Sequence, residues 1–266
     1  MIRFVLPLLV TLTLALPARA EVEIQEVQTP GGLTAWLVEE HSIPFTALEI
    51  WFRGGTSLDR PGKRGAVNLM TATLEEGAGD MDALAFTRAK EMLAASFGYD
   101  VSDDTLTVSA KFLTENRGKA IALLRESLVN PRFDQDAVDR VRGQVASIIR
   151  SDEKDPNDIA GRAFESQAFP DHPYGTDSNG TLDSLNGLTR QDMLDAHADT
   201  MARDRIYIGA VGDITPEELA TLLDDLLGDL PETGAPLPAD IEPALTGGTT
   251  VVPYDTPQSV ALFGHS

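Results

Sequence analysis

The protein has 266 residues, with 21 Lys and Arg against 42 Asp and Glu, and its formal net charge is −21. Because this acidic excess repels the phosphates of nucleic acid, we expect no nucleic-acid partner. The chain contains no cysteine, which excludes disulfides, a thiolate nucleophile, a cysteine-based metal site and a lipid anchor on cysteine.

Residues 1–20 have the pattern of a secretory signal peptide. Arg3 gives a positive start, an apolar run follows from Phe4 to Leu16, and Ala18-Arg19-Ala20 is a small-x-small cleavage site. The apolar run is shorter than the ~20 residues that span a bilayer, and no later stretch approaches that length. The sequence therefore predicts a mature chain without a membrane span that starts at Glu21 and is periplasmic or secreted.

The chain after Glu21 alternates strand patterns with helical ones. Alternating apolar residues predict half-buried strands at 34–39 and 47–52. Apolar residues three and four positions apart then predict helices over 64–76 and 82–96. Alternation returns at 105–112 and predicts another antiparallel strand.

The second half of this region is mainly helical. A long helix is predicted over 134–151, with one apolar stripe formed by Val138, Val141, Val145, Ile148 and Ile149. Thr189 and Thr215 each have an acidic residue three positions later and so predict capped helix starts. This order predicts an α+β domain over 21–230, with helices packed on one face of a mostly antiparallel sheet.

The composition changes after Leu230. Residues 231–248 are rich in proline and glycine and predict an extended linker. Strand patterns follow at 249–253 and 259–263, shortly before the sequence stops. Because a strand pair without the rest of its sheet exposes unpaired edges, we interpret 249–266 as the start of a truncated second domain.

Two glycine-rich stretches, 54–59 (GGTSLD) and 62–77 (GKRGAVNLMTATLEEG), resemble the first strand end and helix of the insulinase/pitrilysin metallopeptidases, which include mitochondrial processing peptidase. Later stretches agree with this family in order and spacing, namely 97–100 (FGYD), 130–133 (NPRF), 155–156 (DP), 172–175 (HPYG) and 211–213 (VGD). The resemblance implies a processing-peptidase-like fold, also seen in LuxS, in which two homologous domains form a clamshell around an extended peptide. The chain would then hold the first domain, the linker and the start of the second.

The resemblance also implies where a zinc site would lie. Such peptidases carry H-x-x-E-H on one helix, where two histidines bind zinc and the glutamate polarises the metal-bound water. Matching Gly65 and Gly77 to the glycines around this motif places Asn68, Thr71 and Ala72 at the His, Glu and His positions. None of these three side chains can perform the corresponding role.

A glutamate on the later long helix supplies the third zinc ligand in this family. Matching Asp155-Pro156 to the family's equivalent pair places Ile148 at this position and Val141 at the other position of the family's glutamate pair on that helix. Zinc catalysis requires three converging ligands and an open fourth position. We therefore predict no catalytic, cofactor-binding or metal-binding residues, and we expect the degenerate positions to be packed.

Other candidates have more ordinary interpretations. The four histidines, His41, His172, His197 and His265, are far apart in the sequence, and no two have helical i, i+4 spacing. Adjacent carboxylates at 75–76 and 103–104 are more typical of solvated surface than of acid–base pairs. Residues 172–175 are more typical of a packed turn than of a binding site.

Three functions remain open. The first is a non-catalytic homologue that pairs with a zinc-bearing peptidase subunit and helps to bind and position extended peptides. The alternative is a stand-alone periplasmic peptide-binding or scaffold protein that holds extended peptides by strand addition. An active zinc metalloendopeptidase is opposed by Asn68, Thr71, Ala72 and Ile148.

Overall fold

The structure is a computed structural model that describes residues 22–255 and 257–265. The expected signal segment, 1–20, lies outside the described residues. Six strands form one sheet with the order β1-β2-β8-β3-β7-β6. Their bounds are Gln25–Gln28 (β1), Thr34–Glu39 (β2), Phe45–Arg53 (β3), Ser96–Val101 (β6), Thr105–Leu113 (β7) and Ile206–Gly212 (β8). Every neighbouring pair is antiparallel except β2 and β8, which are parallel.

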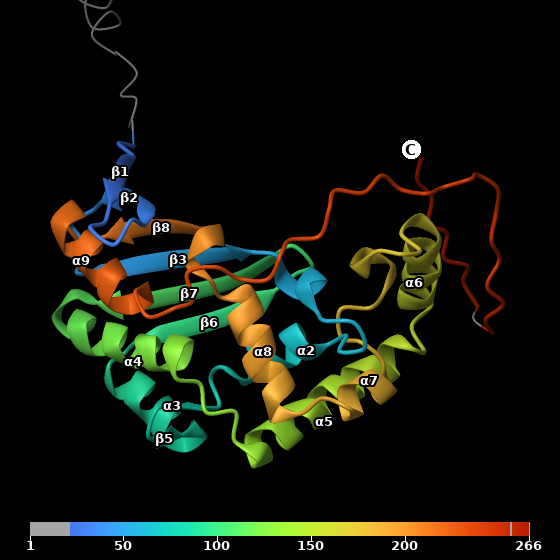
Figure 1. The fold of residues 1–266 in the computed structure, drawn as a ribbon, viewed down its shortest axis with the longest axis horizontal. Coiled ribbons are helices and arrows are strands. Elements are labelled where there is room, and N and C mark those ends of the chain that lie inside the picture. The colour runs from blue at the N-terminus through green and yellow to red at the C-terminus, as the bar shows by residue number, and fades with distance from the viewer. Residues whose placement is uncertain (1–21, 256, 266) are drawn as a thin grey trace, which may run out of the picture.

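Helices pack against one face of this sheet (Figure 1). The helices are α2 (Ala66–Thr73), α3 (Ala83–Met92), α4 (Arg117–Val129), α5 (Gln135–Asp152), α6 (Pro156–Ala168), α7 (Leu182–Asn186), α8 (Arg190–Thr200) and α9 (Pro216–Leu227). A short hairpin of β4 (Gly77–Ala78) and β5 (Met81–Asp82) joins α2 to α3. This arrangement confirms the predicted α+β class.

The strand pattern divides the sheet into a buried face and an open face. Along β3, Leu48, Ile50 and Phe52 are buried under the helices, whereas Trp51 is exposed. β7 repeats the alternation, with Leu106 and the residues at every second position after it in the core. The alternation of apolar residues in the sequence therefore indicates that helices cover only one face of the sheet.

Helix starts follow the predicted caps. The side chains of Thr189 and Thr215 accept hydrogen bonds from the backbone N–H groups of the first turns of α8 and α9, and both complete a capping box. α2 is shorter than predicted and starts after Gly65, whose φ of +95° is left-handed. The sequence analysis did not identify the helices α4, α6 and α7, or the edge strands β1 and β6.

The expected strands at 249–253 and 259–263 are wrong, because no strand forms in the described residues after 230. The hydroxyl of Thr250 instead donates to the side chain of Gln167 on α6, and the hydroxyl of Tyr254 donates to the Lys154 carbonyl. This segment lies along α6 (Figure 1). None of the described helices is long and apolar enough to cross a membrane.

Candidate functional site

The four positions of the degenerate zinc motif lie on two helices that pack together. Asn68, Thr71 and Ala72 belong to α2, and Ile148 belongs to α5. The structure thus brings the four matched positions onto one pair of contacting helices. The side chains at these positions have three different environments, which determine the chemistry of the site.

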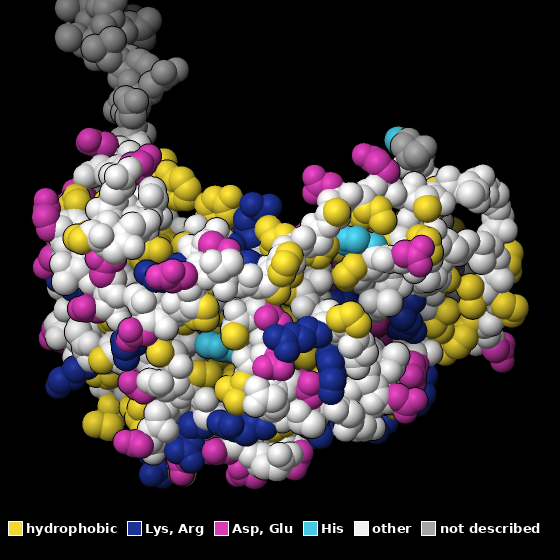
Figure 2. Space-filling model, viewed as in Figure 1, with side chains coloured by type: hydrophobic (Ala, Val, Ile, Leu, Met, Phe, Trp, Pro, Cys, Tyr) yellow, Lys and Arg dark blue, Asp and Glu magenta, His cyan; other side chains and the backbone are white. Residues whose placement is uncertain are grey.

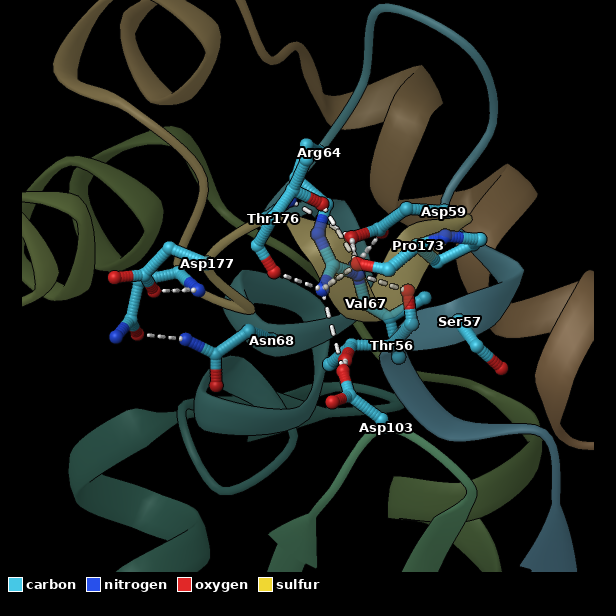
Figure 3. Close-up of polar contacts among 12 residues, drawn as sticks. Thr56, Ser57, Asp59, Arg64, Val67, Asn68, Asp103, Pro173, Thr176 and Asp177 are labelled. Carbon is cyan, nitrogen blue, oxygen red and sulfur yellow. Dashed lines mark hydrogen bonds and ion pairs between the residues drawn. The ribbon is translucent and has the colours of Figure 1, made fainter. Parts of the chain in front are cut away.

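The polar side chain of Asn68 is hydrogen-bonded to a loop. Its Nδ2 donates to Oδ1 of Asn179, with the two atoms 2.5 Å apart (Figure 3). The loop approaches α2 so closely that a Cβ on Gly65 would lie 2.5 Å from the Asn179 carbonyl oxygen. The position that the sequence analysis matched to the family's first histidine thus holds an amide that is paired with a neutral side chain.

The remaining positions divide into buried and exposed. Thr71 is 3% exposed, and its hydroxyl donates to the Val67 carbonyl within the helix, 2.8 Å away. Ala72 is exposed and Ile148 is 49% exposed. The expectation of a packed site is therefore wrong for these two residues. An apolar stripe marks residues that a neighbouring element can cover, and no element of the described chain covers this side of α5 near its end, where Ser147 is also exposed.

The start of α2 is held by a buried ion pair. Asp59 accepts hydrogen bonds from the backbone N–H groups of Gly65 and Val67, both at 2.8 Å, and contacts the Arg64 guanidinium at 3.3 Å. Burial raises the pKa of Asp59, although these backbone donors and Arg64 favour its ionised form. Asp59 is thus a structural cap for a helix that lacks a side-chain cap on Gly65 itself.

Arg64 connects this cap to two other segments. Its guanidinium donates to the backbone carbonyls of Pro173 and Thr176, at 3.3 and 2.9 Å, and to the carboxylate of Asp103 at 3.2 Å (Figure 3). Arg64 therefore fixes the loop that carries Asn179 against α2. The sequence analysis missed this network, because a single arginine in a glycine-rich stretch gives no sign of such distant partners.

The adjacent carboxylates at 75–76 and 103–104 contact structural partners. Glu75 pairs with Lys90, and Glu76 pairs with Arg140. Asp104 accepts a hydrogen bond from the hydroxyl of Tyr174, and this bond raises the pKa of Tyr174 to about 12. The segment 172–175 is a tight helical turn, as predicted.

The residues at the site do not fit zinc. An asparagine amide that is already paired, a threonine bonded to its own helix, an alanine and an isoleucine offer no set of three ligands. Nor do three or more His, Asp or Glu side chains gather elsewhere in residues 22–255 and 257–265 in a way that could hold a metal ion.

Two histidines have clear structural roles. His197 is buried on α8, and its Nε2 lies 2.8 Å from the Leu128 carbonyl oxygen. His41 is exposed and lies 2.8 Å from Asp213 and 3.2 Å from Glu39. The two side chains belong to different parts of the fold, and neither is on α2 or α5.

Strand β6 supplies the remaining feature of the site. It is an edge of the sheet, it pairs only with β7 among the described strands, and it lies beside α2. An edge strand presents unpaired backbone donors and acceptors that can pair with another extended chain. The geometry thus combines a degenerate metal position with an adjacent open strand.

Comparisons with known proteins agree with this geometry. The sequence profile described as Insulinase (Peptidase family M16) matches residues 35–182, and the profile described as Peptidase M16 inactive domain matches residues 187–264. A curated relative, the non-peptidase homolog YmxG of Helicobacter pylori, is 26% identical over 98% of this chain and 60% of its own length. The mitochondrial-processing peptidase subunit beta of Blastocladiella emersonii is 20% identical over 87% of this chain and 50% of its own length.

Solved structures show the same fold. The peptidase M16 inactive domain from Pseudomonas fluorescens superposes with a TM-score of 0.77 at 25% identity, over 83% of this chain and 54% of that structure. A protease from Helicobacter pylori superposes with a TM-score of 0.72 at 19% identity, over 84% of this chain and 55% of that structure. The chain thus spans about half to three-fifths of the length of these relatives. These matches show that the chain belongs to the insulinase family, peptidase family M16, as an inactive member.

Proposed function

We propose that the protein is a non-catalytic subunit that pairs with a zinc-bearing homologue and holds an extended peptide for that homologue to cleave. The observation that carries this proposal is the open β6 edge beside α2, on a framework whose zinc positions hold Asn68, Ala72 and Ile148. A chain that keeps the peptidase fold but lacks the catalytic groups is expected to act through its surfaces.

Pairing with a second subunit is the arrangement that best uses such a surface. One relative is by name a subunit of a processing peptidase. A peptide that lies along β6 would gain backbone hydrogen bonds and a fixed direction, and this positioning accelerates cleavage by a neighbouring active site.

The decisive experiment measures peptide cleavage by the zinc-bearing homologue of the same organism. Its rate is compared with and without this protein, at matched concentrations and for several peptide lengths. We expect omission to lower the rate by about tenfold or more, because positioning effects of this kind are large. Equal rates for all peptides would overturn the pairing with a peptidase.

Hydrogen exchange tests the proposed peptide contact. Addition of an extended substrate peptide should slow backbone amide exchange in β6, Ser96–Val101. The opposite edge strand, β1, Gln25–Gln28, is the internal control and should be unchanged. Slower exchange in β6 together with equal cleavage rates would support the stand-alone peptide-binding protein instead.

We also place the protein in the cell envelope or outside the cell, because residues 1–20 have the signal-peptide pattern. N-terminal sequencing of the protein recovered from an envelope fraction should start at Glu21. Recovery from the cytoplasm with Met1 intact would contradict this placement.

A further inference from the structure

The chain contains two Asn-Gly pairs, Asn179-Gly180 and Asn186-Gly187, and no other asparagine precedes a glycine. Such a pair is chemically labile, because glycine has no Cβ to hinder attack by its own backbone nitrogen on the preceding side-chain amide. The two pairs lie close together in the sequence, but the structure holds them in different ways. Their contacts therefore decide which pair can react in the folded protein.

Several contacts fix the first pair. Oδ1 of Asn179 accepts the hydrogen bond from Nδ2 of Asn68, and the backbone N–H of Asn179 donates to Oδ1 of Asp177 at 2.9 Å. The backbone N–H of Gly180 donates to the Asp177 carbonyl at 2.9 Å, and Gly180 is buried with a φ of +76°. A Cβ on Gly180 would overlap the Arg64 carbonyl oxygen, so the backbone has little room to move. Attack by the Gly180 nitrogen would require these contacts to break.

The second pair lies at the end of a short helix and has few contacts. Asn186 is the last residue of α7, and its exposed side chain forms no hydrogen bond within the described part of the chain. The backbone N–H of Gly187 is shared between the carbonyls of Asp183 and Ser184, both at 3.1 Å. A Cβ on Gly187 would meet nothing closer than 3.5 Å. Because helix ends open locally at low cost, the Gly187 nitrogen is released far more easily than that of Gly180.

We propose that Asn186 deamidates spontaneously in the folded protein, whereas Asn179 is protected. The Gly187 nitrogen loses its proton to solvent and attacks Cγ of Asn186, the side-chain nitrogen leaves as ammonia, and a five-membered succinimide ring forms. Water then opens this ring at one of its two carbonyls, which gives either aspartate or isoaspartate. The net reaction consumes one water and releases one ammonia. It does not depend on β6 or on a partner subunit, so it stands or fails separately from the proposed function.

Isoaspartate at this position lengthens the main chain next to a buried contact. Leu188 is 3% exposed, its carbonyl accepts a hydrogen bond from Arg142, and Thr189 caps α8. α7 packs on α5 and leads into α8 (Figure 1). Figure 2 shows acidic and basic side chains interspersed over this face of the molecule, so no large basic patch lies ready to pair with a new carboxylate. The modified chain should therefore be less stable than the original one.

One tryptic peptide reports both sites, because residues 163–190 contain both Asn-Gly pairs and no Lys or Arg before the last residue. The folded protein is kept at physiological temperature in mildly alkaline buffer, and mass spectrometry of fragment ions follows the conversion of each asparagine with time. A sample digested at time zero corrects for conversion during digestion. We expect Asn186 to convert about tenfold faster than Asn179 or more, since only its contacts open readily.

Unfolding the chain supplies the reference for this difference. In urea the contacts of both pairs are lost, and the two rates should become similar because both asparagines precede glycine. Equal rates in the folded protein, or a faster rate at Asn179, would overturn the proposal. A folded protein in which neither site converts, while the chain in urea converts at both, would overturn it as well.

Two variants test the contacts themselves. Asn68→Ala removes the partner of Asn179 and should raise the rate at Asn179 several-fold, while the rate at Asn186 stays unchanged as the internal control. Gly187→Ala fits the local space and should lower the rate at Asn186 about tenfold or more, because the added Cβ hinders the attack. A rise of both rates in Asn68→Ala, or an unchanged rate at Asn186 in Gly187→Ala, would contradict these assignments.

The consequence for stability needs a control that carries the charge alone. Asn186→Asp has the carboxylate of the product without the longer main chain. After long incubation, the original chain should unfold at a lower urea concentration than Asn186→Asp that has not been incubated. Equal midpoints, with isoaspartate identified in the incubated sample, would show that the connection between α7 and α8 tolerates the longer main chain and would overturn this consequence.

Discussion

The four positions of the degenerate zinc motif differ in the substitutions that they tolerate. Asn68 is half-buried and Ala72 is exposed, so larger polar side chains fit there without entering the core. Ile148 is exposed on the adjacent helix α5. Thr71 is in the core, where a carboxylate would lie away from water. The ligand positions can therefore be rebuilt more easily than the position of the catalytic base.

The first prediction concerns this rebuilding. The triple variant Asn68→His, Ala72→His, Ile148→Glu should bind about one zinc per chain after dialysis, whereas the original chain retains none, because three ligands then converge on packed helices. Adding Thr71→Glu should lower the free energy of unfolding by roughly 2 kcal/mol or more. Metal analysis and urea denaturation measure the two effects. A triple variant without zinc would show that the matched positions do not converge.

The second prediction concerns two histidines with opposite effects of pH. Burial lowers the pKa of His197, so the unfolded chain binds a proton that the folded chain resists, and stability falls as the pH drops below about 6.5. Hydrogen bonds to Asp213 and Glu39 raise the pKa of His41. The stability that protonated His41 contributes is therefore present below about 6.5 and is lost as the pH rises through its folded pKa.

Urea denaturation between pH 5 and 8 checks this pair of effects. His197→Gln keeps a donor for the Leu128 carbonyl and should flatten the loss of stability on the acidic side. His41→Gln should instead remove the loss of stability on the alkaline side of this pH range. The same pH profile for both variants and the original chain would contradict the two assignments.

At the scale of elements, α5 provides a matched pair of sites for the third prediction. Val145 is 5% exposed and faces the core, whereas Ile148 lies one turn later and is 49% exposed. Val145→Asp should unfold the protein or lower its thermal midpoint by 10 °C or more, because a charge would be buried without a partner. Ile148→Asp should change the midpoint by only a few degrees. Circular dichroism on heating measures both, and equal shifts would place the two residues in one environment.

The sequence predicted those elements whose pattern depends on their own residues. Strands β2, β3 and β7 alternate because one face is covered, and α8 and α9 start at threonine caps, so all of them were visible in the sequence. Strand β6 was missed although Phe97, Tyr99 and Val101 alternate toward the core, because Gly98 and Asp100 between them are residue types that are rare in strands. The Asn68–Asn179 contact joins residues far apart in the chain, and no local pattern reports it.

At the scale of the whole molecule, the packed core ends near Leu230 and an extended segment follows it. Few backbone hydrogen bonds hold this segment, among them one from Ala244 N–H to the Ala168 carbonyl. The fourth prediction is that brief digestion with proteinase K removes residues after 230 first and leaves a stable fragment that ends close to Leu230. Mass spectrometry identifies the fragment. Early cleavage within the sheet would contradict this division.

The place of β8 in the sheet affects the order in which the protein can assemble. β8 lies between β2 and β3, so the β1–β2 pair has no bonded neighbour until residues 206–212 have been synthesised. The apolar faces of Leu37 and Ala35 therefore stay uncovered while most of the chain emerges. A chain built in this way stays incompletely folded for most of its synthesis, so holding by a chaperone during that time is advantageous.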